Sequence, residues 1–140
     1  MKDKNEPITG DEFVIRLVWT KFFDAEQSPP VLPRTFVPRS NERDGVSVFR
    51  LACVLQPEDV LRVLAIEKRP LYGIVLLKVA DLNLLGMSVV PSPIEGIAGH
   101  AVIPELNVTA FVANRNYWKA VAKDLARLAA GNIVRAPELD

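Results

Sequence analysis

The sequence predicts an α+β fold, in which a sheet of five or six short strands packs with two main helices in a single compact domain. Short runs of β-branched and aromatic residues bounded by glycine or proline predict the strands. Two longer segments with apolar residues at helical spacing predict the helices. A length of 140 residues, with 49% hydrophobic and 24% charged residues, is typical of one globular domain.

The predicted strands are short, and most are bounded by turn residues. Residues 13–19 carry apolar side chains on both faces and one charge, Arg16, which indicates a strand covered at least partly on both sides. Asp44-Gly45 is a turn signal before the next predicted strand. The continuous apolar run at residues 73–79 is typical of a central strand. The remaining predicted strands occupy residues 46–50, 73–79, 87–90 and 100–103.

Residues 25–45 predict an irregular segment. It contains four prolines, each of which lacks a backbone donor and disfavours a helix. A loop of this length inside a small domain is uncommon and is often functional or mobile.

Two main helices are expected, at residues 57–68 and 115–130. Pro57 suits the first turn of the former, and Pro70 ends it. In the latter, Asn114 or Asn116 can cap the start and Gly131 the end. Its helical spacing places Trp118, Leu125 and Leu128 against the sheet. One further helical turn is expected at residues 80–85, ending at Gly86.

The chain divides into three predicted parts. Residues 1–10 are polar and of mixed charge, which indicates a mobile N-terminal lead. Residues 11–131 form the single α+β domain, and residues 132–140 form a C-terminal tail or an edge strand. Without a secretory signal or a long apolar stretch, we expect a cytoplasmic protein with no membrane partner.

Charge and motif patterns exclude several function classes. The 17 basic and 17 acidic residues cancel, so no overall field favours nucleic acid. The seven glycines form no phosphate-binding loop, which argues against nucleotide hydrolases and dinucleotide-binding folds. One histidine and one cysteine are too few for a typical zinc or iron site. We therefore expect no cofactor and no metal.

Nucleophilic catalysis has weak support. Cys53 lies in an apolar run and reads as a buried small hydrophobe, with a Cys–His pair to His100 as the minor alternative. A serine triad also has to use His100, and the candidate serines carry no local signature. Those serines are Ser47, Ser88 and Ser92.

Arg16, Arg50 and His100 form a candidate anion pocket. Arginine binds phosphates and carboxylates at two points, and His100 follows glycines that let a ligand approach. Structural ion pairs are the favoured alternative for the arginines, with acidic residues such as Asp11, Asp44 or Glu105 as partners. For His100 the alternative is a strand-end histidine that satisfies a nearby carbonyl or acid.

The basic side of the last helix carries Lys119, Lys123 and Arg127 at intervals of four residues. The stripe suits an RNA or an acidic partner, but a solvated helix face explains it more simply, and Asp124 weakens its field.

Two segments, Asp44-Gly45-Val46-Ser47-Val48-Phe49-Arg50 and Gly99-His100-Ala101-Val102-Ile103, resemble a group of small uncharacterised bacterial proteins. The resemblance spans roughly residues 13–130 and, because that group has no established activity, it implies none. A more distant similarity is to compact NAD-using ADP-ribosyltransferase folds, although their later glutamate motif has no convincing counterpart here. That comparison is an analogy between folds.

Together these observations predict a non-catalytic binding or accessory protein of a bacterial cell, with a protein partner or a second copy of itself. The alternative is a small enzyme or ligand-binding protein that grips an anionic substrate, such as an ADP-ribosyltransferase-like activity. An enzyme needs convergent polar groups in a pocket, whereas an interaction module needs an exposed apolar patch.

Overall fold

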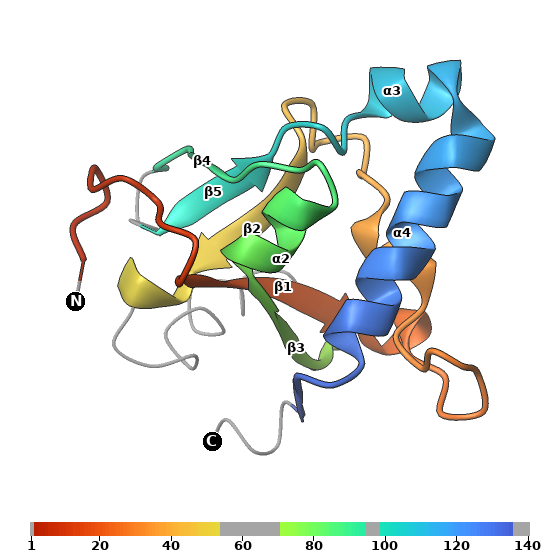
Figure 1. Cartoon of the computed structure of the whole chain (residues 1–140). Coiled ribbons are helices and arrows are strands. Elements are labelled where there is room, and N and C mark those ends of the chain that lie inside the picture. Colours follow the sequence, from red (N-terminus) through yellow and green to blue (C-terminus); the bar gives the residue numbers. More distant parts are fainter. Residues whose placement is uncertain (1, 54–70, 95–98, 136–140) are drawn as a thin grey trace.

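One antiparallel sheet organises the molecule. The computed structural model describes residues 2–53, 71–94 and 99–135. Within them, six strands pair in the order β4-β5-β2-β1-β3-β6 (Figure 1). The predicted α+β single domain is therefore confirmed. In the described part of the chain, no helix is long and apolar enough to cross a membrane.

The centre of the sheet is the pair β1 (Phe13–Trp19) and β3 (Leu71–Lys78). They pair from Phe13–Lys78 to Trp19–Leu71, with one irregularity at Val18/Trp19. Both strands are rich in β-branched and large apolar side chains, which suit a sheet buried on two faces. This long ladder supports the shorter strands on either side.

The outer strands are shorter. β2 (Val46–Arg50) pairs with β1 on one side and with β5 (His100–Ile103) on the other. β4 (Val90–Pro91) and β6 (Ile133–Arg135) are the two edges. β6 shows that part of the predicted C-terminal tail belongs to the sheet as an edge strand. The strand expected at residues 87–90 is shorter and shifted.

The two faces of the sheet bury different clusters. The larger cluster joins Val14, Val48 and Leu77 of the sheet to Leu82 and Leu125 of the helices. The smaller cluster lies on the opposite face and contains Ile15, Leu17, Trp19, Phe49 and Ile74. The alternation of side chains along each strand separates the clusters.

Helix α2 (Val79–Leu84) follows β3 directly and covers the larger cluster. Its C-cap is Leu85, and the glycine predicted to terminate the helical turn, Gly86, follows directly with a φ of 81°. The N–H groups of Gly86 and Met87 donate to Asn83 and Leu82, which is the double hydrogen bond of a Schellman cap. Glycine takes this left-handed backbone without a Cβ penalty.

Helices α3 (Val108–Ala113) and α4 (Arg115–Ala129) follow β5. The Asn107 side chain caps α3 by accepting from Ala110 N–H at 2.8 Å. Asn114 occupies the N-cap position of α4 but makes no side-chain cap bond. Helix α4 runs beside the proline-rich segment, as Figure 1 shows. That segment forms the short 3-10 helix η2 (Pro33–Phe36), which the sequence did not predict.

The buried face of α4 corrects one prediction. Leu125 is fully buried, as expected, and Trp118 is partly buried. Leu128 is 36% exposed and does not pack inward as predicted. The buried stripe contains Ala122, Ala126 and Ala129 beside Leu125. These small residues let the helix lie close to the sheet. Because they define the inner face of the helix, Leu128 lies outside that face.

The remaining described elements are two short 3-10 helices, η1 (Thr20–Phe22) and η3 (Leu51–Cys53). The helix predicted at residues 57–68 lies outside the described residues.

Candidate functional site

Arg16, the lone charge of β1, is buried against a carboxylate. Its Nη1 and Nη2 donate to the two carboxylate oxygens of Glu42 at 2.6 and 3.2 Å. Its Nε donates to the carbonyl of Thr35 at 2.9 Å, and Nη1 also donates to the carbonyl of Ser47 at 2.8 Å. The protein itself therefore occupies four of the five guanidinium N–H groups.

The Arg16–Glu42 pair completes the junction between β1 and β2. The two strands pair only at Val14–Arg50 and Ile15–Phe49. Beyond that point the Ser47 carbonyl accepts from Arg16, and the Ser47 N–H donates to Glu42 at 2.7 Å. Because buried backbone groups need partners, the ion pair takes the place of strand hydrogen bonds here.

Arg50 is completely buried and holds the N-terminal segment. Its Nε and Nη2 each donate to a carboxylate oxygen of Glu12 at 3.1 Å. The remaining N–H groups donate to the carbonyls of Lys4, Glu6 and Pro7 at 2.8–3.5 Å. All its donors are thus used inside the fold, and residues 4–7 lie against the domain.

Glu12 remains ionised beside Arg50. Its burial opposes ionisation, but hydrogen bonds from Arg50, from the backbone of Thr9 and from Lys2 outweigh that cost and lower the pKa of Glu12.

His100 is joined to Ser47 across the β2–β5 ladder. Its Nδ1 lies 2.6 Å from the carbonyl oxygen of Ser92. A carbonyl can only accept, so Nδ1 carries a proton. In the neutral ring, Nε2 is then an acceptor, and the Ser47 hydroxyl lies 3.1 Å from it. The predicted carbonyl contact of His100 is therefore present, together with a serine that had no sequence signature.

The three predicted pocket residues do not all meet. Arg16 and His100 line one cavity of about 200 Å³, together with Ser47. Arg50 is not among the described residues that line it. Both arginines form structural ion pairs, which was the alternative to an anion pocket. Their partners are Glu42 for Arg16 and Glu12 for Arg50, and neither was among the acidic residues suggested from the sequence. Among the carboxylates that the sequence suggested, Glu105 instead accepts from the N–H and hydroxyl of Ser88 at 2.8 and 2.7 Å.

Cys53 is a buried thiol. Burial raises its pKa above the ordinary value, so the reactive thiolate is disfavoured. Its Sγ lies 3.8 Å from the Asp3 carbonyl, while both ring nitrogens of His100 have other partners. The structure therefore gives no support to a Cys53–His100 pair.

A larger cleft lies elsewhere, between the proline-rich segment and helices α3 and α4. It measures about 680 Å³ and is lined by Val37, Pro38, Phe111 and Ala122 among others. Phe111 and Ala122 are buried, whereas Val108 and Val112 at its side are 41% and 70% exposed. Exposed apolar groups beside an apolar cleft are typical of binding surfaces.

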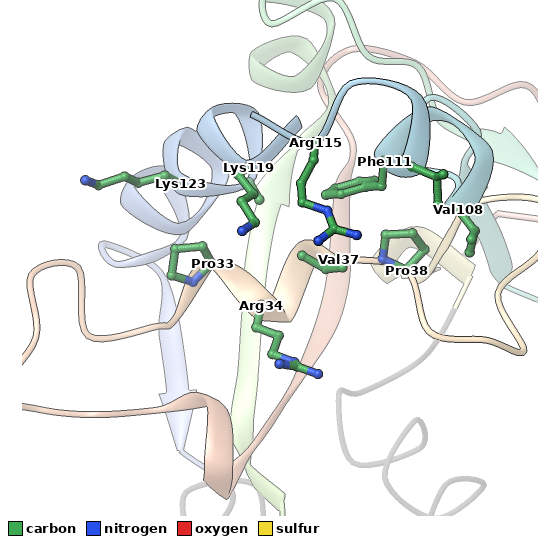
Figure 2. A pocket seen from close by; sticks show the side chains of 11 residues that line it. Pro33, Arg34, Val37, Pro38, Val108, Phe111, Arg115, Lys119 and Lys123 are labelled. Carbon is green, nitrogen blue, oxygen red and sulfur yellow. The ribbon is translucent and has the colours of Figure 1, made fainter. Parts of the chain in front are cut away.

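Four cations border this cleft: Arg34 from η2, and Arg115, Lys119 and Lys123 from α4. Figure 2 shows the side chains of Arg115 and Lys119 reaching from α4 toward η2. No acidic residue is among the described residues that line the cleft. Within the described part of the chain, no carboxylate pairs with any of the four. We call this feature the basic cleft.

The basic cleft agrees only partly with the stripe that the sequence suggested. Lys119 and Lys123 belong to both. Arg127 lies outside the cleft and pairs with Asp124 at 3.2 Å. Arg115, one helical turn before Lys119, lines the cleft instead. Helix α3, whose Phe111 lines the cleft beside α4, was not predicted from the sequence.

No family model, curated protein or solved structure matches this chain significantly. Among the described residues, no group of three or more His, Cys, Asp or Glu side chains is placed to hold a metal ion. Function is therefore inferred from the geometry of the two cavities.

Proposed function

We propose that the chain is a binding protein whose basic cleft takes an acidic segment of a partner protein, anchored by an apolar side chain. The observation that carries this proposal is the combination of an apolar cleft with four bordering cations and no lining carboxylate among the described residues. The net charge of the chain is zero, so this positive surface is local. A cytoplasmic location belongs to the same proposal.

The spacing of the cations favours a regular segment as the ligand. Arg115, Lys119 and Lys123 follow one another at intervals of four residues on α4. A helix rises about 1.5 Å per residue, so the three side chains form a row about 12 Å long. A partner helix with a carboxylate at every fourth position repeats the same spacing of about 6 Å. Opposite charges then face each other along the cleft.

The cleft also offers a place for an apolar anchor. Val37 and Pro38 form one wall, and Phe111 and Ala122 form the other. Burial of a leucine-sized side chain is worth about 1.5–3 kcal/mol. In this binding mode the apolar anchor supplies affinity, while the charges orient the segment and select against basic partners.

The alternative of a small enzyme that grips an anion through Arg16, Arg50 and His100 has less support. Arg50 has no exposed surface, and its donors are all engaged. Arg16 is similarly committed to Glu42, Thr35 and Ser47.

Fluorescence anisotropy with a labelled amphipathic peptide tests the proposal. The peptide is about three helical turns long, with glutamate at every fourth position and leucines on the same face. We expect saturable binding that weakens as salt increases, because salt screens exposed charges. A control peptide with lysine in place of each glutamate keeps the leucines and should not bind.

Matched variants locate the binding. Lys119→Glu and Val112→Asp change exposed side chains of the cleft and should each weaken binding at least about tenfold. Arg127→Glu makes the same charge change on α4 outside the cleft and should leave binding within about twofold. Equal binding of the acidic and basic peptides overturns the proposal. A fatty acid is the alternative ligand for an apolar cleft with cations at its border. Binding of the fatty acid dodecanoate in the cleft, with no binding of the acidic peptide, would also overturn the proposal.

A further inference from the structure

We propose that Ser47 is a nucleophile, activated by His100, that reacts with activated carboxylic esters in the smaller cavity. This inference is independent of the basic cleft, because the two cavities share no lining residue. It rests on the placement of one hydroxyl and one imidazole, each partly exposed and both lining a cavity of about 200 Å³.

The sheet register brings the two side chains together. Ser47 pairs with Val102, and Phe49 pairs with His100. Ser47 and His100 are therefore diagonal neighbours on one face of the β2–β5 ladder, a separation that a histidine side chain spans. The ring of His100 also makes an edge contact with Phe49, with centroids 5.7 Å apart. Regular strand structure thus fixes both groups.

The hydrogen bonds set the direction of proton transfer. The Ser92 carbonyl accepts a hydrogen bond from Nδ1 of His100 and so keeps the proton on that nitrogen. The lone pair of Nε2 is then directed toward the Ser47 hydroxyl, with 3.1 Å between Nε2 and Oγ. This is the arrangement in which a histidine acts as a general base toward a serine hydroxyl. Ser92 acts as a positioning residue through its backbone, since its carbonyl fixes the tautomer of the imidazole.

The lining of the cavity suits a small acyl group. Asn41 lines it and carries a side-chain amide, the kind of N–H donor that stabilises an oxyanion. Trp19, Phe49 and Ile94 give it apolar walls. Its volume is below the usual range of about 300–1,000 Å³ for ligand pockets, which favours a small acyl group.

The proposed reaction is ester hydrolysis through an acyl-serine. Ser47 Oγ forms a bond to the carbonyl carbon of the ester while His100 Nε2 takes the hydroxyl proton. The bond from that carbon to the alcohol oxygen then breaks, and Nε2 gives the proton to the leaving alcohol. Water, activated by the same nitrogen, adds to the acyl-serine, releases the carboxylic acid and restores the serine. No redox change and no cofactor are involved.

The experiment treats the full-length protein with p-nitrophenyl acetate and with a fluorophosphonate probe, and locates the adduct by peptide mass spectrometry. We expect one adduct, and we expect it on Ser47. His100→Gln should slow labelling of Ser47 by at least about 10²-fold. Ser88→Ala removes a hydroxyl outside this cavity and should leave the rate unchanged.

Two results would overturn the inference. They are adducts confined to lysines or to the imidazole, and an unchanged Ser47 labelling rate in His100→Gln. The position of the adduct is determined on the unmodified protein, so it decides the question even if His100→Gln fails to fold. A melting curve for each variant separates loss of folding from loss of reactivity.

Discussion

Arg16 and Glu42, 26 positions apart, form a two-point ion pair with distances of 2.6 and 3.2 Å inside the domain. Both side chains are almost completely buried. The same carboxylate accepts from the backbone N–H groups of Arg39 and Ser47, so it joins the proline-rich segment to β2. The pair therefore connects the wall of the basic cleft to the centre of the sheet.

Glu42→Gln should lower the free energy of unfolding by about 3–5 kcal/mol, because it leaves the buried Arg16 guanidinium without its counter-charge. Asp44→Asn is the matched control, since Asp44 is an exposed carboxylate two positions away, and its effect should stay within about 0.5 kcal/mol. Urea denaturation of the two variants measures the difference. Equal effects would show that the buried pair adds nothing to stability.

Glu12 predicts a pH dependence of stability. Its pKa in the folded protein lies below the ordinary value of 4.5, so its ionised form stabilises the fold fully above that value. This contribution is lost as the pH falls from 4.5 through the lower folded pKa. Glu12→Gln should therefore be less stable than the parent at neutral pH, and the gap should narrow below about pH 4.5. Thermal melting at a series of pH values checks this, and a gap that is constant with pH contradicts it.

Leu125 and Leu128 differ in burial on the same helix. Leu125→Ala should cost about 2–5 kcal/mol because it opens a cavity in the core. Leu128→Ala should cost less than about 1 kcal/mol, because this side chain already meets solvent. Denaturant midpoints of the two variants give the comparison. If Leu128→Ala were the more destabilising of the two, the assignment of the Leu125 face of α4 to the core would be wrong.

Gly45 is the glycine at which a side chain is least tolerated in the described turns. Its φ is 133°, and a Cβ would lie 2.3 Å from the Ile103 carbonyl oxygen. Gly45→Ala should therefore destabilise the protein by more than about 1 kcal/mol. Gly131→Ala, which meets no atom within 4 Å, should be neutral or slightly stabilising. Melting temperatures of both variants provide the test.

Local sequence patterns predicted much of the sheet and the end of α2. Residues 13–19 and 46–50 carry β-branched side chains, and they form strands over the same bounds in the structure. Gly86 marked the end of a helical turn because its backbone requirement is local. Leu128 was misplaced because three alanines, which give a weak hydrophobic pattern, define the buried stripe of α4.

The site was harder to predict because its contacts join distant parts of the chain. Ser47 and His100 are 53 residues apart, and only the β2–β5 register brings them together. Arg16 was recognised as a charge that needs a partner, but nothing near it in sequence indicates Glu42. The basic cleft needs η2 on one side and α3 together with α4 on the other, and neither η2 nor α3 had a clear sequence pattern.

A charge exchange across the basic cleft tests the proposed function most directly. In the triple variant Arg115→Glu/Lys119→Glu/Lys123→Glu, the three cations that α4 places along the cleft become anions, and Arg34 alone stays positive. We expect this variant to bind the lysine-bearing peptide more tightly than the glutamate-bearing peptide, the reverse of the parent protein, because opposite charges again face each other along α4. Arg127→Glu should keep the parent's preference. A triple variant that still prefers the acidic peptide, or that binds the two peptides equally, would contradict the proposed function.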